Sequence, residues 1–223
     1  MTDSPRSGPA LIFDMDGVLV DSNAAHKEAW IRFNRRYGVE TTDAMIEHMY
    51  GRRNDEIVRD FFGSDLPSEE VAARGKAKES FYREMIAAHL EQMLVPGAAQ
   101  FLHRYRDLPM AVASNAEIEN IDFLLDRAGL RPYFRVVLCG SQVARPKPYP
   151  DIYLLAAQLL GVQPQSCVVF EDSPSGVAAA TAASMPVIGL RTTYVNLPST
   201  SLTIDNFFSG ELESWLQAQL RSA

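Results

Sequence analysis

The sequence has little cysteine, no long apolar stretch and no basic run. Only Cys139 and Cys167 are present among 223 residues, and each adjoins an apolar run. We therefore expect two buried free thiols rather than a disulfide or a metal-binding pair. No apolar stretch is long enough to cross a bilayer. The formal net charge is −7 and no Lys/Arg-rich segment is present, which argues against nucleic acid as a partner.

The N-terminal segment also lacks the apolar core of a signal peptide. Residues 1–9 are polar and contain Pro and Gly, so they are predicted to form a flexible tail on a cytoplasmic protein. With 47% hydrophobic residues, the chain can build one domain that carries an insertion. The sequence does not define the oligomeric state, and a monomer is compatible with it.

Five short apolar runs predict the strands of a sheet. They do not alternate between polar and apolar residues, which is typical of parallel strands covered on both faces. The runs are residues 10–13, 110–113, 136–138, 167–170 and 186–190. Helical patterns lie between them, and Ser173 is the expected N-cap of one helix. This alternation predicts an α/β fold with a doubly wound, Rossmann-like parallel sheet.

Residues 24–90 contain helical patterns only, separated by turns at Gly38, Gly51, Gly63 and Pro67. We interpret this segment as a helical cap domain inserted into a core formed by residues 10–23 and 91–223. Its position directly after the first strand places it over the edge of the sheet where that strand ends. The alternative is a helical segment that only packs against one side of the core.

Polar side chains follow four of the five predicted strands. They are Asp14 and Asp16, Ser114 and Asn115, Lys147, and Glu171 with Asp172. The carboxyl ends of parallel strands meet at one edge of the sheet, where ligands bind in folds of this class. Any one of these groups alone is more often a helix cap, a turn or a solvated lysine. Four of them at the same edge indicate a functional site.

These residue types favour phosphoryl transfer. Carboxylates are the hard oxygen ligands that suit Mg²⁺, and no histidine follows these strands, which argues against zinc. Of two carboxylates spaced two residues apart, one can act as nucleophile and the other as acid and base. Ser114 and the amides after it favour an anion, and Lys147 can neutralise charge on transferring oxygens. The set predicts a Mg²⁺ site and an aspartyl-phosphate intermediate.

Four segments resemble the motifs of the haloacid dehalogenase superfamily: FDMDGVLVDS, ASN, RPKPYPDIY and FEDSPSGVAAATAA. The closest resemblance is to its β-phosphoglucomutase-like phosphatases with a helical cap. The resemblance implies a role for each core residue. It implies that Asp14 is the nucleophile and a metal ligand, and that Asp16 is the acid/base and a metal ligand through its carbonyl. It implies that Asp172 is the third metal ligand and that Glu171 reaches the metal through water. The implied phosphoryl-binding groups are Ser114, Asn115 and Lys147. Asp16 also counts against dehalogenation, because dehalogenases of the superfamily typically lack an acid there.

The same resemblance implies substrate contacts in the cap. The candidates are His26, Gly51, Arg52, Arg53 and Lys78. In an ungapped alignment, Asn54 occupies the position of the mutase's phosphate-binding arginine, and Ile57 that of a serine. This difference favours hydrolysis over mutase turnover. His26, Lys78 and the arginines can alternatively be solvated residues on helix surfaces.

Three functional hypotheses follow. The leading one is a Mg²⁺-dependent phosphatase that acts on a small phosphorylated metabolite, with a sugar phosphate as the expected substrate class. The alternative is a β-phosphoglucomutase on the same scaffold. The third is a signalling receiver module that accepts phosphate on aspartate, although such modules are shorter and do not need the helical insertion.

Overall fold

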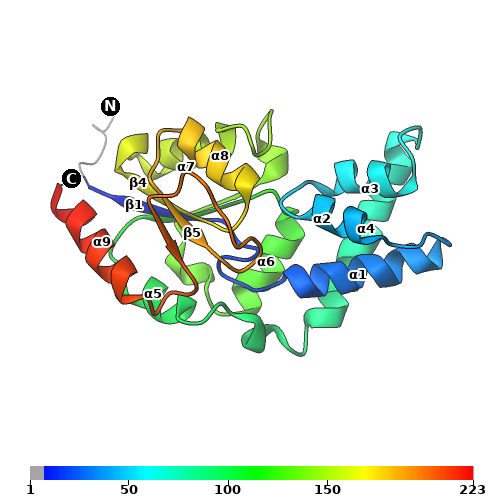
Figure 1. The fold of residues 1–223 in the computed structure, drawn as a ribbon, viewed down its shortest axis with the longest axis horizontal. Coiled ribbons are helices and arrows are strands. Elements are labelled where there is room, and N and C mark those ends of the chain that lie inside the picture. Colours follow the sequence, from blue (N-terminus) through cyan, green and yellow to red (C-terminus); the bar gives the residue numbers. More distant parts are fainter. Residues whose placement is uncertain (1–7, 223) are drawn as a thin grey trace.

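The computed structural model describes residues 8–222. Residues 1–7 of the predicted N-terminal tail therefore lie outside the described residues. The described chain forms a central sheet with helices on both faces, and a group of helices at one end of the sheet (Figure 1).

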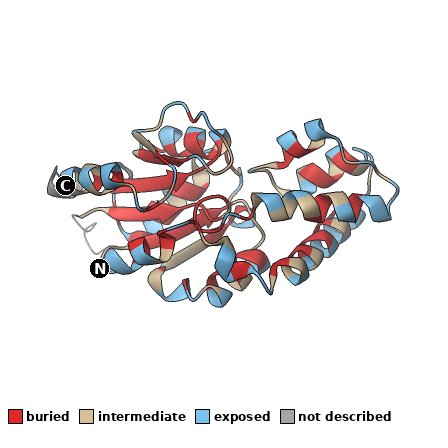
Figure 2. Cartoon of the chain, turned by 60° about the horizontal axis from the view of Figure 1, so that its bottom comes forward, coloured by how far each residue is buried: buried red, intermediate tan, exposed pale blue. Residues whose placement is uncertain are grey.

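The central sheet is parallel throughout and has the order β3-β2-β1-β4-β5-β6. Its strands are β1 (Ala10–Phe13), β2 (Met110–Ser114), β3 (Val136–Cys139), β4 (Cys167–Glu171), β5 (Val187–Leu190) and β6 (Leu202–Ile204). Strand β1 lies at the centre, because Leu11 is in register with Met110 on one side and with Val168 on the other. The strands are buried along most of their length (Figure 2), which explains their continuous apolar sequences.

Two layers of helices cover the sheet. Helices α5 (Ala98–Arg104), α6 (Ile118–Arg127) and α9 (Gly210–Ser222) lie on one face, and α7 (Asp151–Leu160) and α8 (Pro174–Ala182) on the other (Figure 1). Successive strand residues point to opposite faces, so Leu11 and Phe13 join the first apolar layer while Ala10 and Ile12 join the second. Among residues 8–222 there are also four short 3₁₀ turns, at Leu90–Met93, Arg131–Tyr133, Gly140–Gln142 and Pro164–Ser166.

Helices α1 (Asn23–Arg36), α2 (Asp43–Met49), α3 (Asn54–Phe62) and α4 (Ser68–Ile86) form a separate group, which we call the helical insertion. It has its own apolar cluster, in which the ring of Trp30 contacts Phe33 and Phe61 edge to face. The two linkers that join it to the sheet pair with each other. Asp21 N–H donates to the Met93 carbonyl at 2.7 Å, and Val95 N–H donates to the Leu19 carbonyl at 3.0 Å.

The predicted fold class is confirmed, as are the five apolar strands. Ser173 is the N-cap of α8, and its hydroxyl accepts from the Gly176 N–H at 3.1 Å. Two features differ from the prediction. Helix α5 is not predicted, and the last helix of the segment predicted to be helical, residues 24–90, ends at Ile86 and is followed by a 3₁₀ turn. The boundaries of the core and cap domains stay a prediction.

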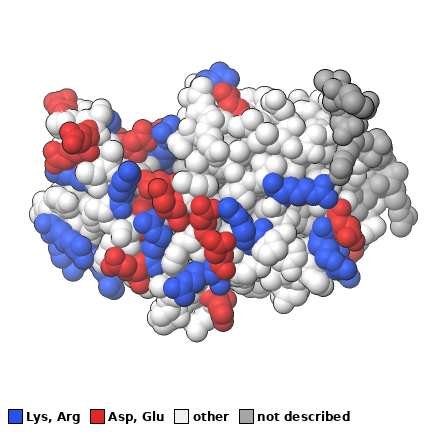
Figure 3. All heavy atoms as spheres, turned by 180° about the vertical axis from the view of Figure 1, so that it is seen from behind, with Lys and Arg blue, Asp and Glu red and all other residues white. Residues whose placement is uncertain are grey.

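Cys139 and Cys167 are buried free thiols, as expected. No helix among the described residues combines the length and apolar character needed to span a membrane. The face drawn in Figure 3 carries Lys and Arg side chains interspersed with Asp and Glu.

Candidate active site

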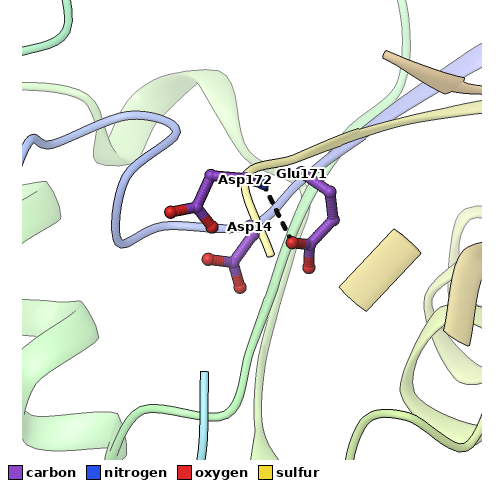
Figure 4. A group of neighbouring side chains, drawn as sticks. All are labelled: Asp14, Glu171 and Asp172. Atoms are coloured by element: carbon purple, nitrogen blue, oxygen red, sulfur yellow. Dashed lines mark hydrogen bonds between the residues drawn. The ribbon is translucent and has the colours of Figure 1, made fainter. Parts of the chain in front are cut away.

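Three carboxyl groups gather at the carboxyl ends of the neighbouring strands β1 and β4. Asp14 directly follows β1, and Glu171 and Asp172 end and follow β4 (Figure 4). One oxygen from each lies within 4.8 Å of the others. The parallel pairing of β1 with β4 brings residues more than 150 positions apart to the same point.

Lys147 is buried between two of these acids. Its ammonium nitrogen lies 2.6 Å from Oδ1 of Asp14 and 2.6 Å from Oε1 of Glu171, and it sits 4.9 Å from the ring centre of Tyr153. The side chain is only 2% exposed. The alternative of a solvated lysine among prolines is therefore wrong, and Lys147 supplies positive charge beside Asp14.

Every side-chain oxygen of the fully buried Glu171 accepts hydrogen bonds from the protein. Oε1 accepts from Lys147 and from the Tyr153 hydroxyl at 2.6 Å, while Oε2 accepts from the backbone of Asp172 and from the backbone and hydroxyl of Ser173. A Cβ at Gly176 would lie 1.8 Å from Glu171 Oε1, so only glycine fits there. Glu171 is thus held rigidly, and it orients Lys147.

Asp172 is held by residues from two other segments. Its Oδ2 accepts hydrogen bonds from the Thr193 hydroxyl and from the Asn23 amide. The turn after β1 passes so close that a Cβ at Gly17 would lie 1.9 Å from this oxygen, and Gly17 also has a φ of +75°. These contacts fix the direction in which the Asp172 carboxyl group faces Asp14.

The acids at this site outnumber the cations that neutralise them. Burial raises the pKa of Asp14 to about 7 against the lowering effect of Lys147, and burial together with Glu171 and Asp14 raises the pKa of Asp172. Burial alone would lower the pKa of Lys147, but the two carboxylates beside it raise it, so it stays charged. A crowded set of carboxylate oxygens with raised pKa values is the donor set that a divalent cation such as Mg²⁺ would stabilise.

Asp16 lies next to this cluster and faces the helical insertion. Its Oδ1 accepts from the Ser22 hydroxyl and lies 3.4 Å from Nε2 of His26. The other ring nitrogen of His26 lies 2.8 Å from the ammonium of Lys78. Because an ammonium group can only donate, this His26 nitrogen accepts, and the neutral ring carries its proton on Nε2 toward Asp16.

Lys78 is almost completely buried, so the alternative of a solvated helix face is wrong for it. Its ammonium forms an ion pair with Glu79 at 2.9 Å and lies 4.9 Å from a ring centre of Trp30. Although burial alone would raise it, the charge of Lys78 is the strongest of the influences that lower the pKa of Glu79 to about 2. The Glu79 carboxyl group is therefore ionised at neutral pH and pairs with Lys78.

Ser114 ends β2 and Asn115 follows it, at the same edge of the sheet. The buried Ser114 hydroxyl accepts from the Ala116 N–H at 3.1 Å, which leaves its proton available to a ligand. The Asn115 amide donates to the Gly51 carbonyl at 2.9 Å. This bond joins the loop after β2 to the loop between α2 and α3, so the insertion closes over the site.

A cavity of about 80 Å³ lies between the sheet edge and the insertion. Ten of the twelve candidate residues line it: Asp14, Asp16, His26, Gly51, Arg52, Lys78, Ser114, Asn115, Lys147 and Asp172. Glu171 lies behind this lining, and Arg53 instead lines an outer hollow of about 420 Å³. The core and cap candidates are thus largely brought together around one small cavity.

Several residues at the site are absent from the sequence prediction. Thr193 follows β5, so the strand-end rule applied to the fifth strand would have found it. No such rule applies to Tyr153, which reaches Glu171 from the first turn of α7. Glu79, Glu117 and Asn120 form contacts between the insertion and the start of α6, and no local pattern marks them; Asn54, which the sequence analysis names only as a replacement for an arginine, joins them.

Known proteins are similar to this chain over most of its length. A family model described as haloacid dehalogenase-like hydrolase matches residues 9–184. Fructose-1-phosphate phosphatase YqaB of Escherichia coli K12 is 34% identical over 181 residues, which cover 81% of this chain and 95% of that protein. Hexitol phosphatase A of the same organism is 34% identical, covering 80% of this chain and 81% of that protein.

A solved structure extends the similarity to the fold. The crystal structure of β-phosphoglucomutase from Clostridium difficile superimposes with a TM-score of 0.84, covers 96% of this chain and 97% of that chain, and is 24% identical. At this identity the similarity concerns the fold, which the two proteins share from the sheet to the helical insertion.

Proposed function

The chain belongs to the haloacid dehalogenase-like hydrolases, and on this premise we propose that it is a Mg²⁺-dependent phosphatase of sugar phosphates that works through an aspartyl-phosphate intermediate. The observation that carries the proposal is the arrangement around Asp14. The carboxylate of Asp14 lies at the end of β1 beside the buried Lys147. The carboxylate of Asp172 lies near it and could bind the same cation, and the insertion closes the cavity around them.

In the first step, a carboxylate oxygen of Asp14 attacks phosphorus, and the bond from phosphorus to the ester oxygen breaks. Protonated Asp16 gives its proton to the departing ester oxygen, so the alcohol leaves neutral. In the second step, Asp16 takes a proton from water as the water attacks phosphorus. The bond to Asp14 then breaks, and inorganic phosphate leaves.

The other residues of the cavity hold the charge that moves in these steps. Lys147, fixed by Glu171, lies within hydrogen-bond reach of Asp14 and stabilises negative charge on the transferring group. The Ser114 hydroxyl and Asn115 bind the phosphoryl oxygens. Asp14, Asp172 and the Asp16 carbonyl would hold Mg²⁺, while Glu171, whose oxygens all accept hydrogen bonds from the protein, orients Lys147 beside it. When bound, Mg²⁺ would neutralise clustered negative charge around the phosphoryl group.

The helical insertion is proposed as the cap that excludes water from the first step. His26 ties Asp16 to Lys78 of α4, so the acid/base is held in place when the insertion is closed. The substrate is a small phosphorylated molecule, and the names of the similar phosphatases point to hexose and hexitol phosphates. A cytoplasmic location stays a prediction.

Two measurements test the proposal. A panel of hexose and hexitol phosphates, assayed for phosphate release with Mg²⁺, should contain a substrate. In addition, β-glucose 1-phosphate with Mg²⁺ and a trace of the 1,6-bisphosphate should yield free phosphate as fast as any glucose 6-phosphate. Glucose 6-phosphate forming much faster than phosphate would replace hydrolysis by the mutase alternative.

A further inference from the structure

Four polar side chains join the insertion to α6 at the end of the cavity remote from Asp14. The Asn54 amide donates to Oε1 of Glu79 at 2.7 Å and to Oε1 of Glu117 at 3.0 Å. The Asn120 amide donates to Oε2 of Glu79 at 2.6 Å. Asn54, Glu79 and Asn120 line the cavity, and Glu117 lies behind Asn54 in the outer hollow.

The cations that line the cavity are already paired with acids, and Arg83, which lies outside this lining, donates to Oδ1 of Asn120 at 2.6 Å. The charge of Lys78 is neutralised by Glu79. Arg52 lines the cavity, but its guanidinium donates to Glu56 at 3.0 Å and to Asp60 at 2.5 Å, both on the following helix α3. Lys147, the third Lys or Arg among the described cavity-lining residues, is held by Asp14 and Glu171 at the opposite end.

Arg53, which lies just outside the cavity, is also engaged. Its Nε lies 3.3 Å from Oδ1 of Asp55. After these pairings, Glu117 adds a further negative charge beside Asn54. Glu117 forms no ion pair with a Lys or Arg among the described residues, so a second anionic group of a ligand that reached Asn54 would meet its negative charge.

Carboxylate and amide oxygens at this end suit hydroxyl groups. An ionised carboxylate accepts about four hydrogen bonds, and Glu79 receives three from Lys78, Asn54 and Asn120, so one acceptor position remains. Both hydrogens of the Asn54 amide are used, which leaves its carbonyl oxygen as an acceptor for the cavity. Hydroxyl groups can donate hydrogen bonds to these oxygens. A phosphate dianion or a carboxylate anion has no hydrogen to donate, and the negatively charged oxygens repel it.

From this arrangement we infer that Asn54, Glu79, Asn120 and Glu117 form a specificity subsite, which selects phosphomonoesters with an uncharged hydroxylated tail and rejects substrates with a second anionic group. The inference rests on the proposed phosphatase function. Asn54 and Ala116 line both the cavity and the outer hollow, so the hydrogen bond between Asn54 and Glu117 marks where the tail ends. Glu117 discriminates by its charge, and Asn54, which holds Glu117 and Glu79, offers its carbonyl oxygen to hydroxyl groups.

A matched pair of substrates tests this subsite. Glucitol 6-phosphate and gluconate 6-phosphate have the same chain length and differ only in a terminal CH₂OH or carboxylate. We expect kcat/KM to be at least about tenfold higher for the glucitol ester. In Glu117→Gln, which keeps an acceptor for Asn54 but removes the charge, this ratio should fall at least about fivefold. The matched control is Glu119→Gln, which removes the same charge from an exposed position in the same turn and should keep the wild-type ratio.

The outcomes separate the inference from the proposed function. Equal kcat/KM values for the two esters in the wild type would overturn the subsite but not the proposed phosphatase function. Turnover of p-nitrophenyl phosphate with no turnover of glucitol 6-phosphate would have the same meaning. An unchanged ratio in Glu117→Gln would remove Glu117 from the subsite. Failure to hydrolyse any of the three esters would overturn the proposed function, and the inference with it.

Discussion

The side-chain amide of Asn115 donates a 2.9 Å hydrogen bond to the carbonyl oxygen of Gly51, so the loop after β2 touches the loop between α2 and α3. Asn115 directly follows Ser114, which lies in the cavity with its hydroxyl proton available. In the proposed function, the segment that offers a hydroxyl to the phosphoryl group therefore also holds the helical insertion over the cavity. Phosphate binding, as proposed, and closure of the cavity would share this short stretch of backbone.

The identity of the nucleophile is tested by Asp14→Asn. The substitution keeps the size of the side chain and an acceptor for Lys147, but it removes the anion that attacks phosphorus. We expect turnover of p-nitrophenyl phosphate to be essentially abolished while the circular dichroism spectrum is unchanged. A rate above about a tenth of wild type, equivalent to a barrier change below about 1.4 kcal/mol, would contradict the assignment.

The metal site is tested by chelation and by thermal unfolding. Excess chelator should stop catalysis, and Mg²⁺ should raise the Tm, because a ligand at a hundred times its Kd stabilises the folded state by about 2.7 kcal/mol. Asp172→Asn is the control: it can still accept from Thr193, but the rise in Tm should be lost. Full activity in excess chelator would show that the carboxylates have another role.

The role of Asp16 is tested by changing the leaving group. Asp16→Asn removes the proton donor, so a sugar phosphate, whose alkoxide leaves poorly, should lose far more kcat/KM than p-nitrophenyl phosphate. We expect the losses to differ by at least about tenfold. Equal losses on both substrates would instead assign Asp16 to positioning of the metal or of the loop.

The buried pair of Lys78 and Glu79 should contribute strongly to stability. Lys78→Met or Glu79→Gln leaves one buried charge without its partner, which typically costs about 3–5 kcal/mol, and the double variant should cost less than the sum. Urea denaturation measures these differences. The exposed pair of Arg131 and Asp122, about 43% and 42% exposed, serves as control and should contribute no more than about 1 kcal/mol.

The same pair predicts a pH dependence of stability. The pKa of Glu79 falls from its usual 4.5 to about 2 on folding, so the unfolded chain binds the proton more readily. The contribution of Glu79 to the free energy of unfolding is therefore present above about pH 4.5 and is lost as the pH falls from there toward 2. The difference in stability between wild type and Glu79→Gln should shrink across that window, and a constant difference would contradict the assignment.

The two thiols should be protected in the folded protein. Burial raises the pKa of Cys167 to about 12, and Cys139 is only 3% exposed. Because the thiolate is the reactive form, neither thiol should react with an aromatic disulfide reagent at pH 8 until denaturant is added. Two equivalents of the reagent's aromatic thiolate per protein chain should then be released. Fast release from the native protein would show that one thiol is accessible.

The strands and the core of the site could be predicted because one physical rule governs both. A parallel strand buried on both faces is a continuous apolar run, and its carboxyl end is where polar residues can reach a ligand. Asp14, Ser114, Lys147 and Asp172 all follow from this rule. Thr193 follows from it as well, although the rule was not applied to β5.

The contacts of the insertion could not be predicted from local pattern. Arg52 has acids four and eight positions later, on the helix that follows it, and only the structure shows that it binds both. Lys78 lies in a polar stretch of α4 that reads as solvated, yet it is buried because Trp30, His26 and Glu79 surround it. Such choices depend on how helices pack, and sequence spacing does not encode that.

The paired linkers between the sheet and the insertion have a mechanical consequence. If the two linkers were not hydrogen-bonded to each other, the insertion could rotate in several directions. Here Val20 bridges Leu94, and the hydrogen bonds from Asp21 to Met93 and from Val95 to Leu19 tie the linkers into a narrow antiparallel ribbon. A hydrogen-bonded ribbon bends out of its plane more easily than it shears within it. The insertion should therefore open by rotation about a single hinge axis and return to the same position relative to the sheet each time.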